Sequence, residues 1–289
     1  MRDRETTIRS RELGEGLRVA LQAAGLSSKD AGVRLGWSDS RVSRLLSGKR
    51  GGSEIDVAAF LAVCGVTGGE RDRLLALCRE MNTRGWLQQH GGTLPKQLRT
   101  LIDHENVATR IDEFQPIVVP GLLQTGDYAR ALLSGTGTLP TDEIEDRVAA
   151  RLARQSLLGS GAGFRFIVHE FALLLPAATP DVMSEQLHHL LRLSVRPYLS
   201  LRVVPASAGV HAGIAGAFKL MEFTEFRPIV YLDSQTASIF LEEPAEIAAY
   251  RRSLSALADT ALDEGQSREL IANIALEKYA TPEDADARP

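Results

Sequence analysis

The chain has 289 residues, of which 44% are hydrophobic and 24% charged, and its formal net charge is −4. This length is typical of about two domains with a substantial core, and the composition excludes a disordered or fibrous chain. No apolar run reaches the roughly 18 residues of a membrane span, and no secretory signal is visible, so we expect a cytoplasmic protein without membrane contact.

The charge is unevenly distributed along the chain. Residues 1–50 hold 11 Lys and Arg against 6 Asp and Glu, a net charge of +5, whereas residues 51–289 carry −9. A basic end on an acidic body is typical of a nucleic-acid-binding module joined to a second domain. Cys64 and Cys78 both follow the spacing of an apolar helix face, so we expect two core residues rather than a disulfide or a metal pair.

Residues 9–82 are predicted to form one all-helical domain. Apolar residues at helical spacing, with glycines at the ends, indicate five short helices. Ser27 is placed to cap the second helix over 28–35, and Ser38 to cap the third over 39–46.

Residues 27–50 meet the requirements of a helix-turn-helix. Ala31 and Gly32 are small residues in the first helix of the motif, where the second helix crosses it. Gly36 turns the chain, and Val42 faces inward from the second helix.

The outer face of helix 39–46 is small, hydroxyl-bearing and basic, which suits a helix that enters a DNA major groove about 12 Å wide. The residues expected to read base edges are Ser40, Arg41, Ser43 and Arg44. The residues expected to hold phosphates are Ser27, Ser28, Lys29, Lys49 and Arg50. The sequence therefore predicts double-stranded DNA as a partner, and a homodimer that places two such helices about 34 Å apart on a near-palindromic site.

The rest of the chain has a different pattern. Residues 83–99 contain paired glycines and a proline and are predicted to be a linker that leads into a helix. Residues 100–280 mix helical periodicity with strand-like runs, so we expect an α+β domain with a mainly antiparallel sheet. The expected helices cover 100–112, 125–134, 142–158, 181–195, 244–260 and 264–278. The expected strands cover 164–169, 199–204, 217–223, 229–233 and 237–242. The acidic tail 281–289 is predicted to be disordered.

No catalytic motif stands out in the second domain. The chain lacks G-x-S-x-G, GxxxxGK[ST] and H-E-x-x-H, and its six histidines do not fall at ligand spacing. We therefore expect no enzymatic activity, no cofactor and no metal site.

Three features of the second domain are candidates for binding a ligand or a protein partner. Arg147, Arg151 and Arg154 recur at i, i+4 and i+7, although a solvated basic face paired with acidic residues explains them more simply. Tyr128 follows a Pro-Gly turn near a helix start, where a purely structural turn is the alternative. His211 lies in a glycine-rich loop between two strands, and such loops often carry binding residues.

Two parts of the chain resemble a known family. The helix-turn-helix of the XRE (phage-repressor-like) family is similar to residues 25–50, GLSSKDAGVRLGWSDSRVSRLLSGKR. The large C-terminal domain of the actinobacterial WhiJ-like and Scr-type antitoxin-like regulators is similar to several later segments, among them IVVPGLLQTGDYARALL and LRVVPASAGVHAGIAGAFKLMEF. The chain departs from the family at Ser28, where glutamine is usual, and at Leu46, where glutamate is usual.

The resemblance covers nearly the whole chain. It implies a five-helix lambda-repressor-like domain and a transcriptional regulator, often encoded beside a small partner protein that it is thought to bind or counteract. Our first hypothesis is a sequence-specific DNA-binding transcriptional regulator that controls its own locus and is regulated through its C-terminal domain. The alternative is an antitoxin-like protein that mainly neutralises a small partner protein from a neighbouring gene. An enzyme fused to a helix-turn-helix would require a deep pocket with convergent titratable groups.

Overall fold

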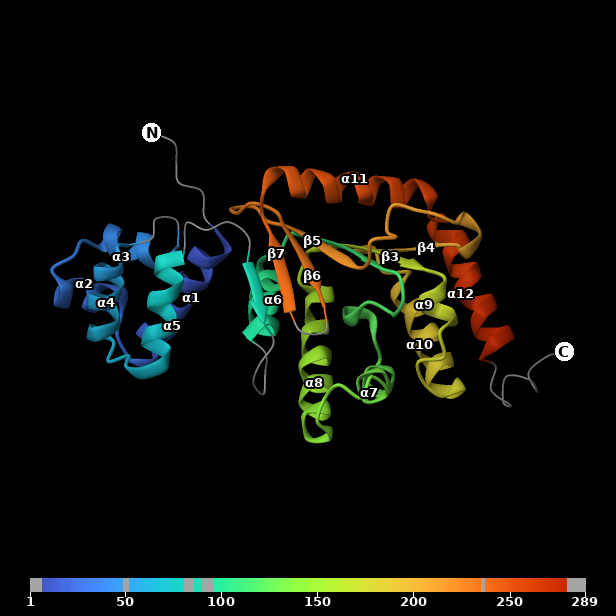
Figure 1. Cartoon of the computed structure of the whole chain (residues 1–289), viewed down its shortest axis with the longest axis horizontal. Coiled ribbons are helices and arrows are strands. Elements are labelled where there is room, and N and C mark those ends of the chain that lie inside the picture. Colours follow the sequence, from blue (N-terminus) through green and yellow to red (C-terminus); the bar gives the residue numbers. More distant parts are fainter. Residues whose placement is uncertain (1–6, 49–51, 81–85, 90–95, 235–236, 280–289) are drawn as a thin grey trace. The chain divides into compact units, whose positions relative to one another are not determined.

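The computed structural model describes residues 7–48, 52–80, 86–89, 96–234 and 237–279 (Figure 1). The chain divides into two compact units. The first consists of residues 1–87 with the short segments 225–227 and 239–244, and the second consists of the remaining residues.

Up to Glu80, the described part of the first unit is helical, as expected. The helices in its described part are α1 (Ile8–Ala23), α2 (Ser28–Leu35), α3 (Asp39–Leu46), α4 (Glu54–Val63) and α5 (Gly68–Glu80). The helix-turn-helix consists of α2 and α3, whose bounds are those that the sequence indicated.

Local capping determines where these helices begin and end. The Ser27 hydroxyl accepts a hydrogen bond from the Asp30 amide at 3.1 Å, and Asp30 Oδ2 accepts one from the Ser27 amide at 3.0 Å, which makes a capping box. Gly36 ends α2 at φ +65°, a left-handed conformation that favours glycine. Ser38 is the N-cap residue of α3, as expected, but its side chain makes no cap hydrogen bond and its hydroxyl lies 3.1 Å from that of Ser40.

The five helices enclose an apolar core. Leu17, Phe60 and Leu61 are completely buried in it, and burial of each such side chain stabilises the fold by about 1.5–3 kcal/mol. Cys64 and Cys78 are free and buried, which confirms the core positions expected for both.

Glycines allow α1 and α2 to approach α3 closely. A Cβ atom on Gly32 would lie 3.1 Å from the Trp37 carbonyl oxygen and 3.5 Å from Val42 Cγ2. One on Gly14 would lie 2.6 Å from the Leu46 carbonyl oxygen. The small residue expected at the crossing of the two motif helices is therefore required by the packing at Gly32.

The remaining chain forms a mixed α and β structure. Its α-helices are α6 (Lys96–Val107), α7 (Gly126–Gly135), α8 (Thr141–Ala153), α9 (Phe171–Leu174), α10 (Pro180–Leu193), α11 (Pro244–Thr260) and α12 (Glu264–Lys278). Its 3-10 helices are η1 (Gly121–Leu123), η2 (Arg154–Gly159) and η3 (Ala206–Ala208). The strands are β1 (Trp86–Gln89), β2 (Arg110–Gln115), β3 (Gly163–His169), β4 (Leu199–Val204), β5 (Phe218–Glu222), β6 (Ile229–Asp233) and β7 (Ala237–Leu241).

The strands form a sheet in the order β1-β7-β6-β5-β2-β3-β4. Strands β2, β3 and β4 run parallel to one another, whereas β5 pairs antiparallel with both β2 and β6. The sheet is mixed and mostly antiparallel, which confirms the expected α+β domain.

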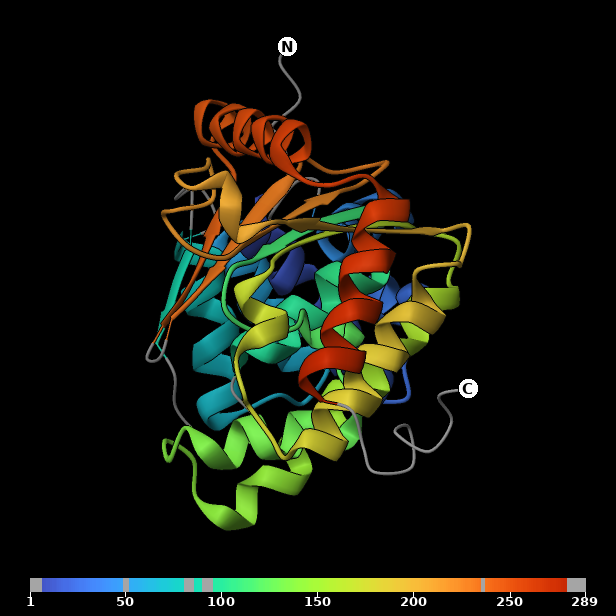
Figure 2. The same ribbon diagram turned by 90° about the vertical axis from the view of Figure 1, so that its right-hand side faces the viewer.

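Helices cover both faces of this sheet. Helix α11 lies on one face, and α6, α7, α8 and α10 lie on the other (Figures 1 and 2). Helix α12 packs beside α10 and β4. None of the helices in the described residues is long and apolar enough to cross a membrane.

The helix expected over residues 100–112 is wrong in its second half. Helix α6 ends at Val107, and residues 110–115 form β2 instead. This strand buries Asp112 and Glu113, and two adjacent buried carboxylates are untypical of a strand. The stretch 83–99, expected to be a linker, includes β1 and the first residues of α6, and the tail 281–289 lies outside the described residues.

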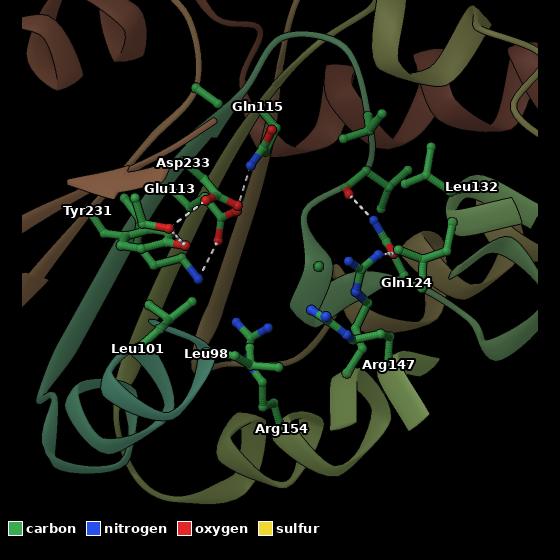
Figure 3. Close-up of a pocket in the computed structure, with 18 of the residues that line it drawn as sticks. Leu98, Leu101, Glu113, Gln115, Gln124, Leu132, Arg147, Arg154, Tyr231 and Asp233 are labelled. Atoms are coloured by element: carbon green, nitrogen blue, oxygen red, sulfur yellow. Dashed lines mark hydrogen bonds and ion pairs between the residues drawn. The ribbon is translucent and has the colours of Figure 1, made fainter. Parts of the chain in front are cut away.

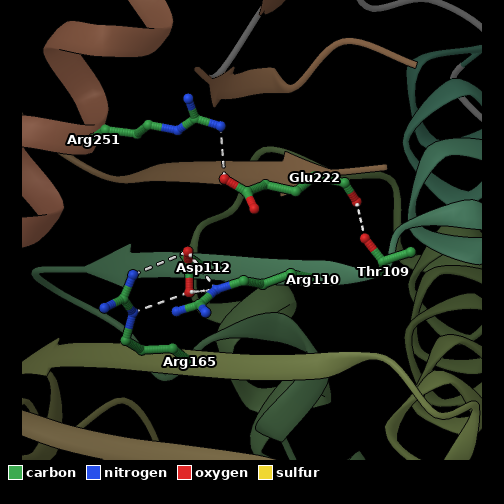
Figure 4. Close-up of polar contacts among 6 residues, drawn as sticks. All are labelled: Thr109, Arg110, Asp112, Arg165, Glu222 and Arg251. Atoms are coloured by element: carbon green, nitrogen blue, oxygen red, sulfur yellow. Dashed lines mark hydrogen bonds and ion pairs between the residues drawn. The ribbon is translucent and has the colours of Figure 1, made fainter. Parts of the chain in front are cut away.

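Ion pairs compensate the buried charge of Asp112. Arg165 Nε and Nη2 donate to its two carboxylate oxygens at 3.0 Å each, and Arg110 Nε lies 3.0 Å from both (Figure 4). Nearby, Arg251 of α11 donates to the Glu222 carboxylate at 2.8 Å. Asp112 and Glu222 therefore each have at least one arginine partner.

Candidate nucleic-acid interface and ligand pocket

The residues expected to read bases all lie on the solvent side of α3. The exposed residues are Ser40, Arg41, Ser43 and Arg44. The buried residues of the same helix are Val42, Leu45 and Leu46. Helix α3 therefore offers a polar, arginine-bearing face of the kind that fits a major groove.

Arg41 is held in place by two neighbours. Its guanidinium lies 4.3 Å from the centre of the Trp37 ring, and its Nη2 lies 2.8 Å from Asp56 Oδ1 in α4. Although burial raises the pKa of Asp56, hydrogen bonds from Ser53 and Arg41 lower it overall. The Arg41 side chain remains 49% exposed, so it is oriented before any partner binds.

Arg44 is less restrained than Arg41. Its Nε donates to the Ser40 carbonyl oxygen at 3.0 Å, and within the described residues it makes no ion pair. An exposed guanidinium without a carboxylate partner keeps its charge and most of its donors available for a base edge.

Helix α1 stabilises the C-terminal end of α3. Arg18 Nη1 donates to the Leu46 carbonyl oxygen at 2.7 Å. A cation at a helix C-terminus satisfies a free carbonyl and opposes the helix dipole. The orientation of α3 therefore depends on α1 as well as on α2.

The expected phosphate contacts are described only in part. The three residues at the start of α2, all exposed, are Ser27, Ser28 and Lys29. The two that lie outside the described residues are Lys49 and Arg50. The Ser27 hydroxyl also donates to Asp30 Oδ2 at 2.6 Å, which lowers the pKa of Asp30. Both bonds of the Ser27 hydroxyl go to Asp30, so Ser27 acts as a helix cap in this structure. The Asp30 carboxylate already supplies negative charge to the first turn of α2.

A pocket of about 390 Å³ lies within the second unit, between the sheet and helices α6, α7 and α8 (Figure 3). Its apolar lining consists of Leu98, Leu101, Val118, Val119, Leu132, Leu133, Leu139, Ala217 and Phe218. Its charged lining consists of Glu113, Arg147, Arg151, Arg154, Lys219 and Asp233. The volume falls within the range of sites that bind small molecules.

Two of the pocket cations are neutralised by buried carboxylates. Arg154 donates to the two Glu105 oxygens at 2.8 Å and 2.7 Å. The Lys219 ammonium lies 2.5 Å from Glu105 and 3.1 Å from Glu113, which faces it across β2 and β5. Burial raises the pKa of Glu105, but Lys219 and Arg154 outweigh this effect and lower the pKa to about 2.

The other two arginines have weaker partners. Arg147 Nη2 donates to Glu143 at 3.1 Å, while its buried Nε has no hydrogen-bond partner within the described residues. Arg151 Nη1 donates to the Gln124 carboxamide oxygen at 2.6 Å, and the described part of the chain offers it no ion pair. Burial, together with the charge of Arg154, lowers the pKa of Arg151.

The arginine series therefore faces inward, and the solvated basic face that we favoured for helix 142–158 is wrong. Helix α8 ends at Ala153, and all three arginines line the pocket. The side chains of Arg147 and Arg154 are only 17% and 9% exposed. The sheet and α6 face this side of α8, which its periodicity alone does not reveal.

Two family models match the chain. A helix-turn-helix domain matches residues 12–74, and a domain of unknown function (DUF5753) matches residues 98–273, more than half of the chain. The chain belongs to the DUF5753 family. Its N-terminal unit is a helix-turn-helix domain, which supports a DNA-binding regulator.

No curated protein matches the chain. The structure of TrmBL2, described as an archaeal chromatin protein that shows a novel mode of DNA binding, is similar at 11% sequence identity with a TM-score of 0.31. The match covers 66% of this chain and 61% of that chain, so the chain spans less than two thirds of TrmBL2. A likeness of this degree does not bear on the function.

Tyr128 supports the pocket of the DUF5753 domain without lining it. Its ring is completely buried, and the Val119 amide donates to its hydroxyl at 3.3 Å. Thr125 caps α7 beside it by accepting from the Tyr128 amide at 3.3 Å. Since Val119 is a lining residue, Tyr128 positions the edge of the pocket.

His211 lies away from the arginines. Its ring stacks on His169 at 5.2 Å between centroids and meets the edge of Phe114 at 5.7 Å. The Gly213 amide donates to His211 Nδ1 at 3.1 Å. The structure therefore does not bring His211 and Tyr128 together with Arg147, Arg151 and Arg154 in one site.

The DUF5753 pocket does contain several titratable groups, which was our condition for considering an enzyme. Ser238 Oγ donates to Asp233 Oδ1 at 2.7 Å and lies 3.1 Å from the Tyr231 hydroxyl. Burial strongly raises the pKa of Tyr231, so its hydroxyl keeps its proton. Within the described residues, no group of three or more His, Cys, Asp and Glu could hold a metal ion. The pocket thus offers hydrogen bonds and positive charge to a bound molecule.

Sequence reasoning missed the sheet side of the pocket. Glu113 and Lys219 were not candidates, although each is a buried charged residue within a strand. A buried charge within a strand pattern is the signal that would have found them, because such a charge requires a partner. Gln124 had no comparable signal, since a lone glutamine after a turn is unremarkable in sequence.

Proposed function

We propose that the protein is a sequence-specific DNA-binding transcriptional regulator in which α3 reads base edges. The observation that carries this proposal is the exposed side of α3, where Arg44 has no ion-pair partner in the described residues and Arg41 is oriented by Trp37 and Asp56. Ser40 and Ser43 complete this face. Arginine donates well to guanine edges, and small hydroxyl residues allow close approach to the groove floor.

Phosphate contacts in this proposal come from both sides of α3. Ser28 and Lys29 are exposed at the start of α2 and suit a phosphate there. Lys49 and Arg50 follow α3 and add two cations in sequence. Such contacts give affinity without sequence preference and weaken as salt rises.

The wider biological role is also a proposal. We place the protein in the cytoplasm as a homodimer on a near-palindromic operator at its own locus, within the WhiJ-like and Scr-type group, and regulated through the DUF5753 domain without catalysis. The fit of the DUF5753 pocket to a small molecule supports regulation through that domain. The antitoxin-like alternative predicts a tight complex with the product of an adjacent short gene.

The test is a titration of the full chain against its own upstream DNA and against random DNA, at two salt concentrations. Arg44→Ala is expected to cost about 1–3 kcal/mol on the specific site and to relax specificity, whereas Lys49→Ala weakens all sequences alike. Arg71→Ala, on α5, removes one positive charge as a matched control. Equal losses on both DNAs for Arg44→Ala would overturn the base-reading role. Repeating the titration with any neighbouring gene product tests the antitoxin-like alternative.

A further inference from the structure

The four positively charged residues that line the DUF5753 pocket form two pairs with different partners. Arg154 and Lys219 share the buried carboxylates of Glu105 and Glu113, so this pair needs no further anion. Arg147 and Arg151 both line the pocket and lie four residues apart on α8, about one helical turn. The cations whose bonding is incomplete in the described residues are therefore those of this second pair, although the Asp233 and Glu113 charges also act on Arg151.

Neither arginine of the second pair is fully compensated by the described residues. Arg147 shares the Glu143 carboxylate through Nη2, and its buried Nε is left without a hydrogen bond. Arg151 is mostly buried and bonds to Gln124, a neutral carboxamide. Burying a guanidinium without a carboxylate is costly, and burial accordingly lowers the pKa of Arg151. An anion that reached both groups would remove this cost.

The rest of the pocket restricts which anion fits. Leu132, Leu133 and Leu139 line it from α7 and the segment that precedes α8, and Leu98 and Leu101 line it from α6. A fully hydrated ion gains no binding free energy from these apolar side chains. An apolar group gains about 25 cal/mol for each Å² of apolar surface that is buried. Because Arg151 alone of this pair lacks an ion pair in the described residues, and Arg147 lacks only a partner for its Nε, a single negative group matches the site better than a polyphosphate does.

We propose that this pocket binds a small organic carboxylate, with the carboxylate held between Arg147 and Arg151 and the apolar body against the leucines. The carboxylate replaces Gln124 as the acceptor for Arg151. Gln124 Nε2 donates to the Val119 carbonyl oxygen at 2.6 Å, and Gln155 Nε2 donates to the Gln124 carbonyl oxygen at 2.5 Å. Ligand binding therefore acts on the contacts that join η1 to the end of α8. Any effect on DNA binding rests on the function proposed above, but the binding itself does not.

The test uses the full chain and two probes, octanoate and 1-naphthoate, below 1 mM in roughly neutral buffer, by calorimetric titration and thermal unfolding. Octanamide and 1-naphthamide are the neutral controls, acetate lacks the apolar body, and inorganic phosphate tests for a simple anion site. At least one carboxylate is expected to bind at least about tenfold more tightly than its amide, and more tightly than acetate or phosphate. Equal binding of acid and amide, tightest binding of phosphate, or binding of neither carboxylate overturns the proposal.

Variants locate the site. Arg147→Met and Arg151→Met keep the apolar stem and are expected to weaken carboxylate binding at least about tenfold. Gln124→Glu supplies an internal carboxylate to Arg151, so it is expected to block the probe while keeping the fold stable. Arg130→Met is the matched control, because Arg130 pairs with Glu145 on the surface of α7, and it should bind as the parent does. Circular dichroism checks that each variant is folded.

Two outcomes separate this inference from the proposed function. Parent-like carboxylate binding by folded Gln124→Glu and Arg151→Met proteins overturns the pocket assignment, whatever the DNA titration shows. If specific DNA binding is absent while carboxylate binding persists and depends on the arginines, only the proposed regulator function is overturned. The same calorimetric samples, mixed with upstream DNA, therefore test the two ideas independently.

Discussion

Helices α3 and α8 both carry arginines at helical spacing, yet the two sets meet opposite environments. On α3, Arg41 and Arg44 lie on the exposed side. On α8, Arg147 and Arg151 face the interior of the DUF5753 domain. Among the described residues, the polar side of α3 is exposed, whereas the polar side of α8 faces other elements of its domain. Arginine spacing alone therefore does not distinguish a surface that binds DNA from the lining of a pocket.

The strongest test of the interior set is Glu105→Gln. Glu105 is completely buried and is shared by Arg154 and Lys219. Removing one partner of a buried ion pair leaves uncompensated charge, so we expect a loss of about 3–5 kcal/mol in the free energy of unfolding. Urea denaturation measures it. Glu145→Gln, which removes the exposed partner of Arg130, is the control and should not change the midpoint. Equal midpoints for both variants would show that the buried cluster contributes nothing.

Acid should weaken the second unit through the same buried ion pairs of Glu105. The pKa of Glu105 is lowered to about 2 in the fold, against about 4.3 for an unfolded chain. The stabilisation is therefore complete above the unfolded pKa and is lost as the pH falls toward 2, by about 3 kcal/mol in total. Unfolding free energies of the parent and Glu105→Gln, measured from pH 6 to pH 2.5, should converge in acid. Parallel curves would contradict the lowered pKa.

A smaller effect is expected where α1 meets the end of α3. Gly48 has φ +66°, and a Cβ atom there would lie 2.4 Å from the Ser10 carbonyl oxygen. Gly48→Ala therefore combines left-handed strain with overlap and should cost about 2–4 kcal/mol. Gly36 has φ +65° but open space around it, so Gly36→Ala should cost only the strain, about 1–2 kcal/mol. Thermal unfolding of both variants checks the difference, and equal losses would rule out the overlap.

The smallest predicted effect concerns the orientation of Arg41. Asp56→Asn removes the carboxylate that pairs with Arg41 and leaves the contact with Trp37. We expect both specific and random DNA to bind about two- to fivefold more tightly at low salt, because one more cation is uncompensated. Fluorescence anisotropy with labelled duplexes measures this change. Asp72→Asn, on an exposed site of α5, is the control, and an identical gain there would show that only net charge matters.

The first unit was largely predictable because its signals are local. Ser27 and Gly36 set the ends of α2, and Gly32 marks its crossing with α3, all within ten residues of one another. The phosphate contacts at Lys49 and Arg50 remain predictions, because those residues lie outside the described part of the chain.

The second unit was predictable in its later strands but not in its pocket. Alternating or β-branched residues identify β3 to β7, whereas β2 was hidden by the adjacent charges of Asp112 and Glu113. These charges are stabilised by Arg165 and Lys219, which lie 53 and 106 residues away in the chain, respectively. Pairing at such separation leaves no periodic trace in the sequence, so the inward turn of the α8 arginines could not be read from it.

The stacking of Arg41 on Trp37 gives the protein an optical reporter of its own. The chain contains two tryptophans, and one of them lies against a side chain that we expect at the DNA edge. Because a DNA contact at Arg41 alters the surroundings of the stacked indole, we expect the emission of Trp37 to change on binding without any attached dye. Engagement of the groove can therefore be followed in the unlabelled protein on the millisecond scale.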